Sequence, residues 1–254
     1  MNENIMKLKQ VIENSDKIVF FGGAGVSTES GIPDFRSADG LYNQKYKYPP
    51  EQIVSHTFFK YNTEEFYNFY RDRMIYTEAK PNKAHIALAR LEEQGKLFCV
   101  ITQNIDGLHQ AAGSKNVLEL HGSIHRNYCT DCGEFYGLEK ITGSSGIPKC
   151  DKCGGIVKPD VVLYEEGLDN KILVNSVKAL RSAEVLIIGG TSLGVYPAAG
   201  LIHEFHGKTL VLINKTETQA DKMADIIIRD PIGETMGAIS EYAGRLRPHG
   251  RFYI

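Results

Sequence analysis

The chain has 254 residues, 42% of them hydrophobic, and a formal net charge of −2, which is typical of a soluble globular protein with a sizeable core. No block of like charge stands out, so we expect no direct binding of nucleic acid or of an anionic membrane. The N-terminal residues lack the apolar core of a signal peptide, and no apolar run approaches the ~20 residues of a membrane-spanning helix. We therefore expect a cytoplasmic protein.

Six short runs rich in Val, Ile, Leu and Phe predict strands that are buried on both faces. They are residues 17–23, 97–104, 117–122, 185–190, 209–214 and 225–230. Helical patterns occupy the N-terminus, residues 82–94 and residues 171–182. This alternation predicts an α/β fold with an open, mostly parallel sheet, helices on both of its faces, and ligands at the carboxyl ends of its strands.

The first predicted strand runs into a glycine loop, residues 23–28, that begins like the dinucleotide fingerprint Gly-x-Gly-x-x-Gly but has Thr28 at the third glycine position. A hydride-transfer enzyme would also carry an acidic residue at a strand end about 20 residues on, where the chain reads Asn-Gln at 43–44. Residues 31–33, Gly-Ile-Pro, end any helix after barely one turn. The loop predicts diphosphate binding with an aromatic lid, residues 34–36, over the reactive end of a nucleotide; an ordinary polar loop is the alternative.

Residues 37–80 interrupt the alternation of strands and helices, and their second half is rich in aromatic side chains. We expect a helical insertion that packs its aromatic side chains together. The large apolar members of this stretch are Phe66, Tyr67, Phe69, Tyr70 and Met74.

Polar side chains follow two later strands. Gln103, Asn104 and Asp106 come after one apolar run, and His121 ends the next. Because the carboxyl ends of parallel strands meet at one edge of a sheet, we expect these side chains near the glycine loop. A lone histidine is more often structural, but this setting favours a catalytic one. No Gly-x-Ser-x-Gly elbow accompanies it, which disfavours a serine hydrolase.

Four of the five cysteines form two Cys-x-x-Cys pairs separated by seventeen residues. The pairs are Cys129 with Cys132 and Cys150 with Cys153. This spacing predicts a zinc site with four thiolate ligands. Four thiolates complete a tetrahedral shell and leave no position for water, so we expect a structural zinc ion. Cys99, inside a predicted strand, is expected to be a small buried apolar residue.

Together these segments resemble the sirtuins, the Sir2 family of NAD-dependent protein deacylases, in their bacterial form. The matching elements, in the family's order, are GAGVSTESGIPDFR, TQNIDGLH, ELHG, the two cysteine pairs, GTSLGVYP and INK. The resemblance implies a Rossmann-like parallel sheet with a small lobe made of a zinc-binding module and a helical insertion. The implied division is a Rossmann-like NAD-binding domain of residues 1–36, 81–127 and 156–254, a helical insertion of residues 37–80 and a zinc module of residues 128–155.

The resemblance also implies that NAD is a co-substrate, that one zinc ion is structural, and that acyl-lysine proteins or peptides are the partners. The implied catalytic residues are His121, as general base, with Asn104 and Asp106 in orienting roles. The residues implied to contact NAD are Ala24, Gly25, Thr28, Phe35, Arg36, Gln103, Ile105, Thr191, Ser192, Asn214 and Ile232.

The implied reaction moves an acetyl or other neutral acyl group from lysine to ADP-ribose, and it gives nicotinamide and 2′-O-acyl-ADP-ribose. Peptides would add as a strand between residues 161–166 and 193–197. Where many members read Phe-Gly-Glu, this chain reads Tyr-Glu-Glu at 164–166. Relatives that favour acidic acyl groups carry Tyr-x-x-Arg, whereas the corresponding stretch here is 67–70, with Arg71 one position off. Without a matching cation for a carboxylate, we expect neutral acyl groups.

Three other functions stay open. They are mono-ADP-ribosyl transfer from NAD to protein, a noncatalytic NAD-responsive interaction module, and an NAD(P) oxidoreductase. His121 with Asn104 and Asp106 favours deacylation over a passive module. The missing third glycine and the missing acidic ribose contact count against hydride transfer.

Overall fold

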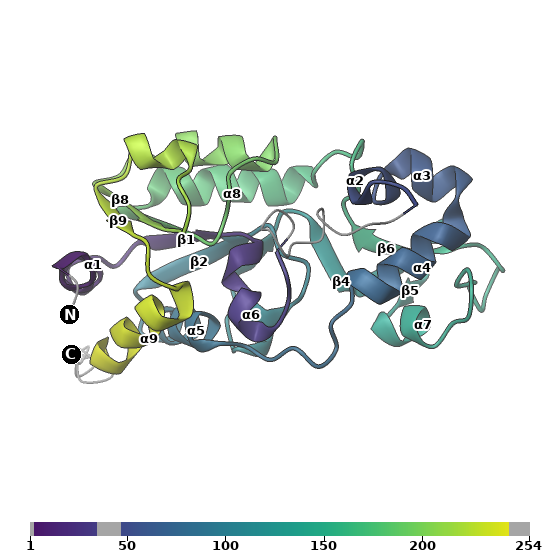
Figure 1. Ribbon diagram of the computed structural model, residues 1–254, viewed down its shortest axis with the longest axis horizontal. Helices are drawn as coiled ribbons and strands as arrows, with labels where there is room; N and C mark the ends of the chain where they lie inside the picture. Colours follow the sequence, from purple (N-terminus) through teal and green to yellow (C-terminus); the bar gives the residue numbers. More distant parts are fainter. Residues whose placement is uncertain (1–2, 35–46, 244–254) are drawn as a thin grey trace, which may run out of the picture.

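The structure, a computed structural model, describes residues 3–34 and 47–243 (Figure 1). Its larger part is a parallel sheet of six strands in the order β3-β2-β1-β7-β8-β9. The strands are β1 (Ile18–Gly22), β2 (Leu97–Thr102), β3 (Val117–Glu119), β7 (Val185–Gly189), β8 (Thr209–Ile213) and β9 (Ile226–Ile228). Each predicted apolar run contains one of these strands, so the predicted α/β fold with a parallel sheet is confirmed.

Helices cover both faces of this sheet (Figure 1). Neighbouring residues of a strand point to opposite faces, and because both sets of side chains are apolar here, each face needs a covering layer. Phe20 packs in the core on one face, and Phe21 packs in the core on the other. The first face carries α1 (Glu3–Glu13), α5 (Lys83–Glu93) and α9 (Ile232–Ala243). The second carries α8 (Asn170–Ser182) and the 3-10 helices η4 (Ala198–Glu204) and η5 (Gln219–Lys222). Cys99 is fully buried in the second core, as expected.

A small lobe lies at one end of the molecule (Figure 1). It holds an antiparallel sheet in the order β5-β4-β6 and four short helices. These elements are β4 (Gly122–Cys129), β5 (Phe135–Tyr136), β6 (Val157–Val161), α2 (Pro50–Ile53), α3 (His56–Tyr61), α4 (Thr63–Arg73) and α7 (Leu138–Thr142). The expected aromatic packing of the insertion is confirmed, and the rings share one core with Cys129, Cys150 and Val157 of the cysteine-rich segment. The exact domain boundaries stay a prediction.

The chain passes from the large sheet to the small lobe through a sharp turn. β3 ends at Glu119, earlier than the predicted run, because Leu120 and His121 form this turn. Gly122 follows with φ +76, and a Cβ there would lie 1.8 Å from the carbonyl oxygen of Asp160. Only glycine fits such a position. The turn places His121 at the junction of the two parts.

None of the helices in residues 3–34 and 47–243 combines the length and the apolar composition that crossing a membrane requires.

Candidate functional site

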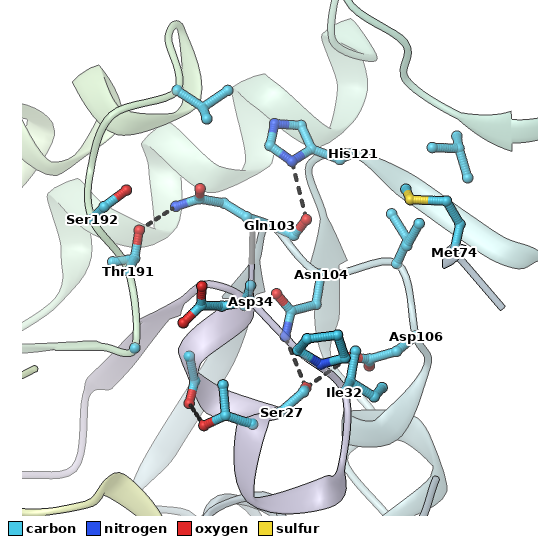
Figure 2. Close-up of a pocket in the computed structure, with 18 of the residues that line it drawn as sticks. Ser27, Ile32, Asp34, Met74, Gln103, Asn104, Asp106, His121, Thr191 and Ser192 are labelled. Atoms are coloured by element: carbon cyan, nitrogen blue, oxygen red, sulfur yellow. Dashed lines mark hydrogen bonds between the residues drawn. The ribbon is translucent and has the colours of Figure 1, made fainter. Parts of the chain in front are cut away.

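A cavity of about 670 Å³ is lined by the carboxyl ends of the parallel strands and by the small lobe, a size that suits a ligand of the dimensions of a cofactor. Figure 2 shows polar side chains from several strand ends pointing into it. The sequence-predicted residues in its wall are Ala24, Gly25, Thr28, Gln103, Asn104, Ile105, Asp106, His121, Thr191, Ser192, Asn214 and Ile232. Phe35 and Arg36 lie outside the described residues.

The glycine loop after β1 packs directly on the loop after β7. The Gly25 amide donates to the carbonyl oxygen of Gly190 at 2.8 Å, and a Cβ on Gly25 would lie 2.8 Å from the Gly190 backbone. Thr28, at the third glycine position of the fingerprint, donates its hydroxyl to the Gly25 carbonyl at 3.0 Å. The second 3-10 turn of the loop, η2 (Thr28–Ser30), ends at Gly31 with φ +85, so the predicted early helix end is confirmed.

A hydrogen-bond network in which Ser27 and Asn104 are buried joins the glycine loop to the end of β2 (Figure 2). Ser27 donates to the Asp106 carboxylate at 2.6 Å, and the Asn104 amide donates to the Ser27 hydroxyl at 3.0 Å. The other Asp106 oxygen accepts the amide of Leu108 at 2.9 Å. With both oxygens in hydrogen bonds, Asp106 is suited to orienting its neighbours rather than to removing a proton.

Ser27 was missed by the sequence reasoning. Its side chain is only 1% exposed, and its two partners lie 77 and 79 residues away in the chain. Its place inside the glycine loop, one residue before Thr28, was the available signal.

His121 occupies the turn after β3 and bonds to the end of β2. Its Nδ1 lies 3.0 Å from the carbonyl oxygen of Gln103. Since a carbonyl can only accept, the ring donates from Nδ1, which leaves Nε2 as the proton acceptor. Burial lowers the pKa of His121, and the hydrogen bond to Gln103 opposes this effect. The ring is therefore neutral at pH 7 and able to act as a base.

Further strand ends complete the cavity. Gln103 donates its side-chain amide to the hydroxyl of Thr191 at 3.2 Å (Figure 2). Ser192 is exposed beside it. After β8, Asn214 donates to the carbonyl of Thr216 at 2.8 Å, and Ile232 begins α9. The Gln103–Thr191 bond holds the loops after β2 and β7 next to each other, and the Asn214 bond shapes the loop after β8.

The side chains with which the small lobe lines the cavity differ from those that the sequence interpretation compared with the family. Tyr67 donates to the carbonyl of Val157 and Arg71 donates to that of Ile141, so both hold the lobe together. In the described part of the chain, the cavity wall contains Tyr70, Arg73 and Met74 instead. The sequence interpretation placed Tyr70 and Met74 in the packing of the insertion and did not consider Arg73, because the register of α4 decides which side chains face the cavity.

The four paired cysteines meet at one point. Their sulfur atoms all lie within 4.8 Å of one another, with Cys129 and Cys153 at 3.4 Å and Cys132 and Cys150 at 3.6 Å. Zinc–sulfur bonds of about 2.3 Å in a tetrahedron require sulfur atoms about 3.8 Å apart, so these cysteines are positioned to bind a zinc ion. The hydroxyl of Tyr136 donates to Cys150 at 3.2 Å and lowers the pKa of that thiol to about 6, which favours the thiolate.

Comparison with known proteins gives a consistent set of relatives. Residues 23–197 match the model of the Sir2 family. An NAD-dependent protein deacetylase of Clostridium perfringens is 63% identical over 242 residues, which cover 94% of this chain and 99% of that protein. One of Cutibacterium acnes is 51% identical, with 92% and 96% covered.

Two similar solved structures hold ligands. A Sir2 homologue in complex with NAD is 40% identical, with a TM-score of 0.85 and 94% of each chain covered. A Sir2 structure with a deacetylated p53 peptide and 3′-O-acetyl ADP-ribose is 38% identical, with a TM-score of 0.86 and 94% and 98% covered.

Proposed function

The chain belongs to the Sir2 family, and we propose that it removes acetyl groups from lysine side chains of proteins with NAD as the co-substrate. The observation that carries the proposal is the place of His121, a half-buried histidine whose Nδ1 lies 3.0 Å from the Gln103 carbonyl oxygen, in the wall of the same cavity as the Ser27–Asn104–Asp106 network. A general base and a set of fixed orienting groups thus face one space that is large enough for a nucleotide.

NAD would lie along the carboxyl ends of the strands. The glycine loop, with Ala24, Gly25 and Thr28, would hold the diphosphate, and Thr191 and Ser192 would contact it from the β7 side. Asn214 and Ile232 would contact the adenosine half. Gln103, Asn104, Ile105 and Asp106 would orient the nicotinamide ribose and its carboxamide. In this arrangement the hydrogen bond to Ser27 holds the Asn104 amide in place before the reaction, which lowers the entropic cost of orienting the reacting groups.

The reaction breaks the bond between nicotinamide and C1′ of the ribose. Nicotinamide leaves as a neutral molecule, and the acetyl oxygen of the substrate lysine bonds to C1′ from the opposite face. Nε2 of His121 then accepts a proton from the ribose hydroxyls, so that the 2′-oxygen can attack the acyl carbon. The bond from the acyl carbon to the lysine nitrogen then breaks, and one water adds to the acyl carbon and releases the 1′-oxygen as a hydroxyl. The products are lysine, nicotinamide and 2′-O-acetyl-ADP-ribose.

The zinc ion supplies no step of this reaction. Its four thiolates would complete the coordination shell, and the described cavity wall includes none of the cysteines. Its contribution is to the fold of the small lobe. Thiolate ligands persist in a reducing compartment, which supports the expected cytoplasmic location.

We also propose that neutral acyl groups are preferred. Arg73 lines the cavity, but its guanidinium is paired with the Asp72 carboxylate at 2.7 Å. A carboxylate on the acyl group would have to compete with Asp72 for this cation.

The test is to incubate the protein with NAD and an acetyl-lysine peptide and to analyse the products by mass spectrometry. We expect a peptide lighter by one acetyl group, together with 2′-O-acetyl-ADP-ribose. A peptide heavier by one ADP-ribose unit would instead support ADP-ribosyl transfer. An unchanged peptide, from folded protein that contains zinc, would refute both activities.

A further inference from the structure

The loop after β6 is joined to the helical insertion along its backbone. The Tyr164 amide donates to the carbonyl of Val54 at 3.0 Å, and the His56 amide donates to the carbonyl of Tyr164 at 2.9 Å. Together these bonds form a parallel bridge between Ser55 and Tyr164. Tyr164 and Glu165 also line the cavity, so this loop contacts both the insertion and the space where the substrate would bind.

Glu165 has an unusual backbone conformation. Its φ is +74, a value that residues with a side chain rarely adopt and that glycine adopts freely. The position is therefore suited to the glycine that many family members carry there. A glutamate at such a site requires a compensating contact.

The compensating contact is made by the Glu165 carboxylate. Its Oε2 accepts the backbone amide of Thr57, in the first turn of α3, at 2.8 Å. Hydrogen bonds from the side chain and from the backbone amide of Thr57 lower the pKa of Glu165. The side chain thus reaches back to the helical insertion.

Glu166 adds a second set of contacts. One carboxylate oxygen lies 2.9 Å from Nδ1 of His56. The other accepts the amide of Leu163 at 2.9 Å and lies 3.1 Å from Nζ of Lys158. The loop of residues 163–166 is therefore closed on itself and held to both α3 and β6.

We propose that Glu165 is a positioning residue for the peptide substrate. Its carboxylate fastens the peptide-binding edge, residues 163–166, to the amide of Thr57, so that the edge is ordered before the peptide arrives. A peptide that adds as a strand gains affinity from main-chain bonds, and it gains more when its partner strand needs no ordering. The proposal rests on the proposed function, because it concerns the binding of the same peptide.

Three variants of the full chain separate the backbone effect from the side-chain effect. Glu165→Gln keeps an oxygen that can accept the Thr57 amide. Glu165→Gly relaxes the backbone but removes the acceptor, and Glu165→Ala removes the acceptor and keeps the unfavourable φ. Glu64→Ala, which removes an exposed carboxylate from the first turn of α4, is the control.

The measurements are kcat, the KM for an acetyl-lysine peptide and the KM for NAD. We expect the glycine and alanine variants to raise the peptide KM about threefold to tenfold, with kcat and the KM for NAD unchanged. The glutamine variant and the control should match the wild type. A glycine variant with the wild-type peptide KM would overturn the proposal, and so would a glutamine variant as poor as alanine.

Peptide affinity by calorimetry and hydrogen exchange of the Thr57 amide report on the same contact without catalysis. We expect weaker peptide binding and faster exchange in the glycine and alanine variants than in the wild type and the glutamine variant. Equal affinities and exchange rates in all variants would overturn the role of Glu165. If the variants differ from the wild type in affinity and exchange as expected, but the wild-type protein releases no acetyl group, the proposed function alone would be refuted.

Discussion

His121 combines two effects that act on one imidazole ring. Burial disfavours the charged ring, and the bond from Nδ1 to the Gln103 carbonyl leaves Nε2 as the proton acceptor. The position of His121 after an apolar strand was visible in the sequence. Its protonation state was not, because burial and the bond to Gln103 arise only when β2 and β3 pair.

The pH dependence of kcat/KM tests this residue. Since burial lowers the pKa of His121, the base stays neutral below the ordinary histidine pKa of about 6.5. We therefore expect the acid limb of the profile to reach half its maximum below that pH. His121→Ala should reduce kcat by about a hundredfold or more and remove this limb.

The control for the His121 variant is His203→Ala, which changes an exposed histidine in η4 and should leave the profile unchanged. An acid limb that persists in His121→Ala would contradict the assignment. Circular dichroism of each variant establishes that it is folded.

At the level of elements, the zinc module and the helical insertion depend on each other. Rings of the insertion pack in the same core as Cys129 and Cys150, so the metal site and the aromatic cluster stabilise one lobe. The zinc ligands could be predicted from the two Cys-x-x-Cys pairs, because the spacing that brings two thiolates together lies within a single turn of the chain. The shared core was not predicted, since it joins segments that are distant in the sequence.

Removal of one zinc ligand tests this dependence. Cys150→Ser should lose the metal and lower the melting temperature, because binding of structural zinc contributes about 10 to 16 kcal/mol to folding in zinc-finger peptides. Zinc content by plasma mass spectrometry and thermal unfolding are the measurements. Cys99→Ala, a buried cysteine of β2, should keep its zinc. A zinc-free Cys150→Ser protein with the wild-type melting temperature would refute the structural role.

At the scale of the whole molecule, the cavity belongs to both parts of the chain. Its wall combines loops of the parallel sheet with Tyr70, Met74 and Leu163 of the small lobe. A ligand that contacts both parts stabilises the folded state by mass action. Ligand binding and global stability are therefore linked.

Thermal unfolding with NAD measures this link. At a concentration of 100 times Kd, NAD should add about 2.7 kcal/mol of stability, or about 5 to 10 °C in melting temperature. Gly25→Ala should lose this shift, because its Cβ would collide with the Gly190 backbone and separate the two loops. Gly167→Ala, whose added Cβ meets nothing within 4 Å, is the matched control. An undiminished shift in Gly25→Ala would contradict the proposed NAD contact.

The sequence by itself determined the six strands, the early end of the glycine-loop helix, and the four cysteines as one metal site. These features depend on residues close together in the chain, where apolar periodicity, glycine, proline and ligand spacing act directly. Only the tertiary structure decided that Ser27 meets Asp106, that Tyr70 rather than Tyr67 lines the cavity, and that Glu165 reaches Thr57. Each of these depends on how strands pair and how α3 and α4 pack, because a side chain's partner is set by the element beside it in space and not by its neighbours in sequence.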